Sequence, residues 1–210
     1  MQRVNVQKLP YVQAVVDGSL DLHDFVRTQV QFFFAVAAYP KNLALLAERI
    51  QWPEAKRALE DNVRDELGRG TSAHSHVQTF RALLRKLGVT DAEIDGSHRW
   101  PCVETFNEGV RAACVDQPAE AGLATVAAIE DLFTHISQEL GAAIADRGWL
   151  SRDEVVHYNV HRELDREHAD ALYGAIDTAK DASVPEVTRG VAAGVSLMTE
   201  LYDGLLLKAK

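Results

Sequence analysis

The chain has 210 residues, of which 47% are hydrophobic and 25% charged, enough to bury the core of one globular domain over residues 1–210. Its formal net charge of −9 argues against a nucleic-acid partner or an anionic membrane, which would require a basic surface. Two cysteines are too few for a disulfide framework, and no signal peptide or membrane-spanning apolar run is expected, which indicates a cytoplasmic protein.

Apolar residues recur with the 3.6-residue period of a helix along almost the whole chain, and no segment alternates like a half-buried strand. The sequence therefore predicts an all-α, single-domain bundle of about seven helices. In chain order, helices are expected over residues 20–50, 53–67, 76–87, 102–115, 118–148 and 184–207. Between the last two, a capping box at Ser151 and Glu154 is expected to begin a further helix. A short helical turn is expected at Asp91.

Residues 155–172, VVHYNVHRELDREHADAL, place many ionisable side chains between apolar positions. At about 100° per residue, His161, Asp165 and His168 fall on one side of a helix, the side that also carries apolar residues. A cation would compensate a buried carboxylate between two imidazoles, so the three form a candidate half of a metal site. The alternative is a hydrogen-bonded core histidine, and His157, one turn earlier, fits either that description or a role in supporting a ligand.

The remaining ligands would be acids or histidines that face the core elsewhere. Glu130 is a lone acid on an apolar helix face, where the alternative is a buried carboxylate bonded to a hydroxyl or an arginine. Glu66 lies in the last turn of its helix, and His76 opens the next helix after a glycine-rich reversal. Spacing alone leaves open whether this reversal returns His76 to Glu66, and His74 is a nearby competitor.

Five runs, in order and at matching separations, resemble the haem-oxygenase-like diiron oxidases: FAVAAYPKNLALL, EDNVRDELG, SHVQTFRALLRKLGV, AAIE and HRELDREHA. The resemblance covers residues from about 20 to 180 and implies a TenA-like or PqqC-like helical fold. Within the family, the chain is most similar to CADD-type para-aminobenzoate synthases and to enzymes that form terminal alkenes or oxygenate amine nitrogen. The H-x3-D-x2-H element at residues 161–168 is the most specific of the motifs.

The resemblance implies six metal ligands, which match this sequence at Glu66, His76, Glu130, His161, Asp165 and His168. The small-residue-then-histidine pattern of the family favours His76 over His74. The resemblance also implies two iron ions, or a manganese–iron pair, with dioxygen as co-substrate and an external electron donor. The expected substrate is a small organic molecule with an amine or a carboxylate, changed by N-oxygenation or oxidative C–C cleavage in a biosynthetic reaction. A homodimer is compatible with the resemblance.

The donor types support this expectation independently, because carboxylates and imidazoles suit iron or manganese better than a thiolate zinc site or an all-oxygen calcium site. A ferritin-like diiron site would need two E-x-x-H motifs, and only Glu154 to His157 fits. The open alternatives are a metal-free TenA-like or PqqC-like enzyme, a para-aminobenzoate-synthase-like protein, and a helical interaction module. The aromatic run Phe32 to Phe34, with Tyr39, lines either a pocket or the core.

One departure from the resemblance concerns a lysine. The para-aminobenzoate synthases are thought to consume one of their own tyrosines, assisted by a lysine on the helix that carries the middle glutamate. Here no lysine occurs between Lys86 and Lys180, and Tyr11 lies one residue away from the expected tyrosine position when Gly18 is used for alignment. The sequence therefore predicts an external substrate.

Overall fold

The computed structural model describes residues 4–209, which contain helices and turns but no strand. This confirms the all-α prediction. The described residues hold nine α-helices, however, rather than about seven. They are α1 (Pro10–Asp17), α2 (Leu22–Arg49), α3 (Pro53–Glu66), α4 (His76–Lys86), α5 (Asp91–Gly96), α6 (Pro101–Val115), α7 (Ala119–Asp146), α8 (Val156–Thr178) and α9 (Val184–Ala209).

The two additional helices are the short ones, α1 and α5. The α1 segment is rich in valine, which has a low helix propensity, but it begins with Pro10 at its first turn and ends at Gly18, whose φ is +88°. Packing overrides the propensity, because Tyr11 and Val15 on its inner face are fully buried. The turn expected at Asp91 is extended into α5 by a capping box between Thr90 and Glu93.

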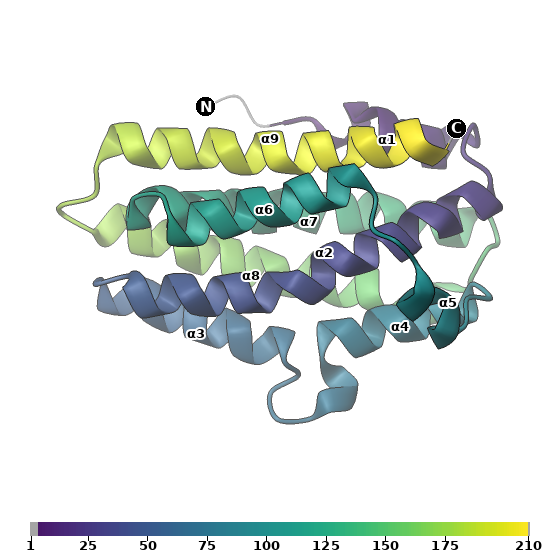
Figure 1. Cartoon of the computed structure of the whole chain (residues 1–210), viewed down its shortest axis with the longest axis horizontal. Helices are drawn as coiled ribbons and strands as arrows, with labels where there is room; N and C mark the ends of the chain where they lie inside the picture. The colour runs from purple at the N-terminus through teal and green to yellow at the C-terminus, as the bar shows by residue number, and fades with distance from the viewer. Residues whose placement is uncertain (1–3, 210) are drawn as a thin grey trace.

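Long antiparallel helices make up the bundle, with α7 at its centre (Figure 1). α7 packs along both α8 and α9, while α2 packs against α3 and α6. Residues around most of α7 are buried, as expected for a helix with neighbours on several sides. α9 approaches α7 closely at Gly190, where a Cβ atom would lie 2.2 Å from the carbonyl oxygen of Ala121. The small residues of the GVAAG segment, residues 190–194, therefore allow close packing.

The capping box at Ser151 and Glu154 is present, but it does not start the long helix directly. It closes a 3-10 turn, Arg152–Glu154, and α8 begins two residues later at Val156. Val155, between the two elements, has φ −83° and ψ +43°, outside the helical region. The 3-10 turn therefore separates the capping box from α8, whereas the sequence predicts that the capping box begins the long helix itself.

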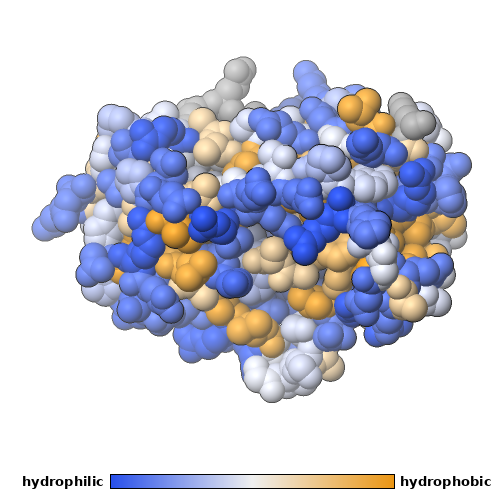
Figure 2. Space-filling model, viewed as in Figure 1, coloured by the Kyte–Doolittle hydropathy of each residue, from blue (hydrophilic) through white to orange (hydrophobic). Residues whose placement is uncertain are grey.

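Two helices, α2 and α9, are long and apolar enough to cross a membrane by length and composition, which corrects the expectation that no such segment occurs. In α2, 56% of the apolar window is buried inside the bundle, and in α9, 39% is buried. A core helix of a soluble protein passes the same test, so this is weak evidence of a span. The face in Figure 2 is mainly polar, with apolar patches scattered among charged side chains.

Candidate metal centre

α8 carries its buried ionisable side chains on one face. His161, Asp165 and His168 are 4%, 0% and 6% exposed. The Nδ1 atom of His161 lies 2.8 and 2.9 Å from the two carboxylate oxygens of Asp165. His168 places its Nε2 atom 3.1 Å from Oδ2 of Asp65 on α3. The four-and-three spacing thus brings the three side chains to one buried face.

His157 has the surroundings of a core histidine. It is fully buried, its Nδ1 atom lies 3.1 Å from Oγ1 of Thr79, and its ring packs edge-on against Phe80 with centroids 4.5 Å apart. Burial, followed by the charges of His161 and His76, lowers the pKa of His157 well below its ordinary value, so the ring is neutral. It packs against His161, with centroids 4.3 Å apart, and among the described residues it makes no hydrogen bond or ion pair with a carboxylate.

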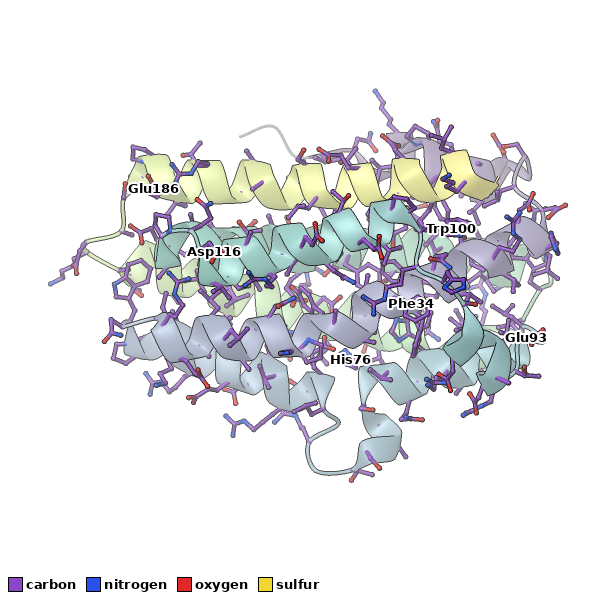
Figure 3. The ribbon with its side chains drawn as sticks, in the orientation of Figure 1. Phe34, His76, Glu93, Trp100, Asp116 and Glu186 are labelled. Atoms are coloured by element: carbon purple, nitrogen blue, oxygen red, sulfur yellow. The ribbon has the colours of Figure 1, made fainter. Side chains whose placement is uncertain are left out.

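Glu66 ends α3, His76 begins α4, and the loop between them folds back so that the two side chains meet. The Nδ1 atom of His76 lies 2.8 Å from Oε1 of Glu66, and the two side chains are 2% and 3% exposed. His74 is exposed to solvent in a 3-10 turn, Ser72–His74. His76, labelled in Figure 3 at the start of α4, is therefore the histidine that reaches Glu66.

Glu130 on α7 brings the third carboxylate to the cluster. Ligand atoms of Glu130, Asp165 and His168 lie within 4.8 Å of one another, close enough to hold one metal ion. Oε2 of Glu130 is 3.8 Å from Nδ1 of His168. Its other oxygen, Oε1, accepts hydrogen bonds from Nδ2 of Asn62 at 2.7 Å and from the Tyr39 hydroxyl at 3.0 Å.

Several imidazole nitrogens at this cluster are buried without a hydrogen-bond partner among the described residues. They are Nδ1 of His76, Nε2 of His161 and Nδ1 of His168, and Nε2 of the neighbouring His157 is unpartnered as well. The contact between His76 and Glu66 is short but lacks the alignment of a hydrogen bond. Unpaired buried polar atoms are costly, and a cation would supply the missing partner. Three carboxylates and three imidazoles therefore fit iron or manganese, and the assignment of each as a ligand stays a prediction.

The clustered charges alter the protonation of the site. Burial, reinforced by the carboxylates of Glu130 and Glu66, raises the pKa of Asp165 well above its ordinary value. Burial alone would lower the pKa of His168, but the carboxylates of Glu130 and Asp65 raise it to about 9. Without a cation, both groups therefore favour their protonated forms.

We expect divalent metal ions to displace protons from this site, so that affinity increases with pH. Coordination requires a deprotonated Asp165 and a neutral His168. The pKa of His168 is raised to about 9 and that of Asp165 is raised well above its ordinary value, so both groups tend to hold their protons when no metal is bound. For each proton that metal binding releases, the affinity for the metal should increase about tenfold for every unit by which the pH rises. Calorimetric titration with Mn²⁺ in two buffers of different ionisation enthalpy would count the protons. An affinity that stays constant between about pH 6 and 8 would contradict the expectation.

Asp65 is a site residue that the sequence analysis missed. It lies next to Glu66 in the last turn of α3 and accepts from Nε2 of His168, and its two oxygens accept from Nε and Nη2 of Arg69. A carboxylate at the outer nitrogen of a metal-binding histidine holds the proton there and leaves the inner nitrogen free for a metal. The four-residue spacing of Asp65 and Arg69 could have predicted their ion pair. No local spacing predicts the contact of Asp65 with His168, because the two residues are 103 positions apart.

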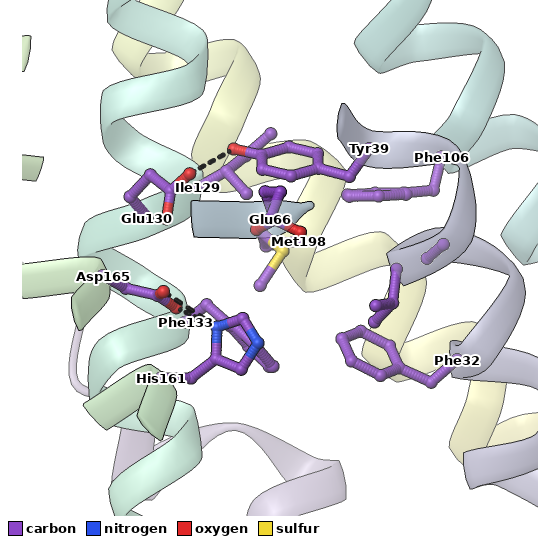
Figure 4. A pocket seen from close by; sticks show the side chains of 12 residues that line it. Phe32, Tyr39, Glu66, Phe106, Ile129, Glu130, Phe133, His161, Asp165 and Met198 are labelled. Atoms are coloured by element: carbon purple, nitrogen blue, oxygen red, sulfur yellow. Dashed lines mark hydrogen bonds and ion pairs between the residues drawn. The ribbon is translucent and has the colours of Figure 1, made fainter. Parts of the chain in front are cut away.

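The cluster borders a small apolar cavity of about 40 Å³ (Figure 4). Four of the six candidate ligands line it, together with aromatic and aliphatic side chains from α2, α6, α7 and α9. Tyr39 supplies the only hydroxyl group among the described residues that line the cavity, and it points toward Glu130. Phe32 also lines the cavity, whereas Phe33 packs against Phe34 and Phe80. The aromatic run therefore serves both the pocket and the core.

A family model described as iron-containing redox enzyme matches residues 27–203. The chain belongs to this family. The match includes all six candidate ligands and most of the bundle. It confirms the resemblance inferred from the motifs and identifies iron and redox chemistry as properties of the family.

Relatives of this iron-containing redox enzyme include 4-aminobenzoate synthases. The protein from Nitrosomonas europaea is 24% identical over 191 residues, which cover 88% of this chain and 77% of the relative. The protein from Chlamydia trachomatis is 22% identical over 139 residues, 66% of this chain. That match spans 59% of the Chlamydia trachomatis protein, less than two thirds of its length.

Solved structures confirm the fold of this iron-containing redox enzyme. A CADD-like protein of unknown function from Nostoc punctiforme superposes with a TM-score of 0.81 at 16% identity, covering 98% of this chain and 90% of that one. A haem-oxygenase-like domain from Shewanella denitrificans gives a TM-score of 0.79 at 16% identity, with coverages of 97% and 86%. A TenA homologue from P. horikoshii gives 0.77 at 15% identity, with coverages of 98% and 92%. The predicted haem-oxygenase-like, TenA-like architecture is thus correct.

Proposed function

We propose that this protein is a non-haem diiron enzyme that uses dioxygen to oxidise a small organic molecule. The observation that carries the proposal is a buried chain of contacts among three carboxylates and three imidazoles beside an apolar cavity. Glu66 meets His76, whose ring packs on His161 with centroids 4.2 Å apart. His161 meets Asp165, which lies together with Glu130 and His168. The proposed ligands are Glu66, His76, Glu130, His161, Asp165 and His168. Such a donor set suits two ferrous ions or a manganese–iron pair, and membership of an iron-containing redox family supports iron.

When bound, the two metal ions would supply electrons to dioxygen. The protein would provide a dry and ordered site around them. Phe32, Phe133 and Met198 line the cavity and keep its walls apolar, which limits the access of bulk water. Asp65 accepts the Nε2 proton of His168 and so orients that ring.

The proposed substrate carries an amine or a carboxylate and is oxygenated at nitrogen or cleaved at a C–C bond. No lysine or arginine occurs among the described residues that line the cavity, so a charged group on the substrate would be balanced by the metal cluster itself. A volume of about 40 Å³ suits dioxygen or a few water molecules. A larger substrate must therefore displace wall side chains, and further turnovers would need electrons from an external donor.

The cysteines give no support to a metal-free alternative with a nucleophilic thiol. A thiolate is the reactive form of cysteine, and burial raises the pKa of Cys114 to about 12. Burial also raises the pKa of the half-buried Cys102. Neither cysteine is among the described residues that line the cavity. The buried carboxylates and imidazoles, by contrast, are explained by metal binding, which a metal-free enzyme would not require.

We expect the purified chain to bind two iron ions per subunit and, once reduced, to react with dioxygen. Anaerobic loading with ferrous iron followed by metal analysis gives the stoichiometry, and absorption spectra recorded on aeration follow the reaction. A ceiling well below one iron, with no optical change, would contradict the diiron proposal.

Alanine variants on α7 and α8 test the ligand assignment in the same assay. His161→Ala and Glu130→Ala should abolish turnover, because each removes a proposed ligand. His157→Ala should keep most of the turnover despite a loss of stability from the cavity it leaves, since this ring is hydrogen-bonded to Thr79 and pairs with no carboxylate among the described residues. Equal loss of activity in a folded His157→Ala variant would show that the ligands of α8 are assigned wrongly.

We expect no 4-aminobenzoate from the iron-loaded chain when only reductant and oxygen are supplied. α7, which carries Glu130, contains no lysine. The Tyr11 hydroxyl contacts Thr28 at 2.5 Å and Gln29 at 2.9 Å, and neither is a base that would take its proton. Product analysis and the intact mass of the protein would test this expectation. Release of 4-aminobenzoate together with loss of a tyrosine side chain would contradict it.

A further inference from the structure

Glu130 differs from the other proposed ligands in the way its carboxylate is held. Two neutral donors from different helices bind the same oxygen: Nδ2 of Asn62 on α3 lies 2.7 Å from Oε1, and the hydroxyl of Tyr39 on α2 lies 3.0 Å from it. The second oxygen, Oε2, faces Nδ1 of His168 at 3.8 Å. Asn62 and Glu130 are buried, so water does not compete freely for these positions.

A carboxylate oxygen has two in-plane lone pairs, and these two donors engage both lone pairs of Oε1. We infer that Tyr39 and Asn62 are positioning residues that restrict Glu130 to binding metal through Oε2 alone. This inference rests on the proposed diiron function. A metal ion that also bound Oε1 would have to displace a buried hydrogen bond and leave its donor unpaired.

The restriction has a consequence for catalysis. A glutamate that chelates a metal ion with both oxygens occupies one coordination position more than a glutamate that uses one oxygen. Holding Oε1 away from the metal therefore leaves a position open on the cavity side, where dioxygen or substrate can bind. Tyr39 lines that cavity, so the hydroxyl group that holds Oε1 belongs to a residue of the cavity wall.

Cobalt provides a direct test, because its visible absorption weakens when its coordination number increases. Tyr39→Phe removes one hydroxyl group and little else. We expect this variant to bind Co²⁺ with an affinity about 10-fold to 100-fold lower, and with weaker visible bands as Glu130 becomes free to chelate. Tyr202→Phe is the matched control, since the Tyr202 hydroxyl is buried without a partner among the described residues and does not line the cavity. Its cobalt affinity and spectrum should equal those of the wild type.

Asn62→Leu is the second variant and removes the other donor with little change in volume. It should shift the cobalt spectrum in the same direction, and circular dichroism would verify that both variants are folded. If Tyr39→Phe and Asn62→Leu both bind cobalt with the wild-type affinity and spectrum, the positioning role is overturned while the diiron proposal stands. If the wild type itself binds no cobalt or iron, both the inference and the diiron proposal fail.

Discussion

Asp165→Asn will stabilise the metal-free protein and, at the same time, abolish its capacity to bind iron. Asp165 is fully buried, and burial with the charges of Glu130 and Glu66 raises its pKa well above that of the unfolded chain. The ionised carboxylate is therefore a cost to the fold when no cation is present. Asparagine has nearly the same shape, is neutral, and keeps an oxygen that can accept from Nδ1 of His161.

The expected gain is about 1 kcal/mol at neutral pH, or a rise of roughly 2–4 °C in Tm for a chain of this size. A raised native pKa means that the folded state binds more protons than the unfolded state, so the cost of the carboxylate grows as pH rises. The advantage of Asp165→Asn should therefore be larger at pH 8 than at pH 5. Thermal unfolding of the metal-free proteins and metal analysis after iron loading measure the two effects.

Asp170→Asn is the matched control, because Asp170 lies on the same helix but is exposed. It should change neither Tm nor iron binding appreciably. A metal-free Asp165→Asn protein that is less stable than the wild type would show that the carboxylate contributes favourable contacts that outweigh its burial.

Gly68→Ala will disrupt the connection between Glu66 and His76 far more than Gly70→Ala. Both glycines have left-handed φ values, +79° and +89°. A Cβ atom at residue 68 would lie 2.4 Å from the carbonyl oxygen of Thr71 and 2.5 Å from the backbone nitrogen of Ser75, whereas residue 70 has nothing within 4 Å. These contacts are with backbone atoms, so no side-chain rotation relieves them.

Gly70→Ala should cost about 1 kcal/mol, the price of a left-handed alanine. Gly68→Ala adds a steric clash and should cost several kcal/mol or rearrange the loop, which would separate Glu66 from His76 and lower the affinity for iron. Denaturant unfolding and iron titration of the two variants make the comparison. Equal stability of the two variants would show that the loop does not adopt this conformation.

The sequence predicts the helices well where their apolar period is long. The pattern identifies all seven long helices because each buries a continuous stripe, as α7 does around Glu130. α1 is missed because its valines disfavour a helix and only tertiary contacts of residues such as Tyr11 stabilise it. Local propensity carries no information about those contacts.

The candidate site is predictable to a similar extent and for similar reasons. The contact of His161 with Asp165 follows from helical spacing, because both residues lie on one element. The meeting of Glu66 with His76 depends on a loop conformation that spacing does not determine, and it was expected only from the family resemblance. Asn62 was missed because its partner, Glu130, lies on a distant part of the chain.

The way the proposed ligands are distributed along the chain means that a bound metal ion would also stabilise the fold. α3 and α4 are joined by the loop that begins at Glu66 and ends at His76, and bound metal would tie this hairpin to α7 and α8 as a cross-link does. A disulfide is broken by reductants, but this link would be lost only when iron is withdrawn. Removal of the metal should therefore loosen the α3–α4 hairpin and make it more sensitive to proteolysis.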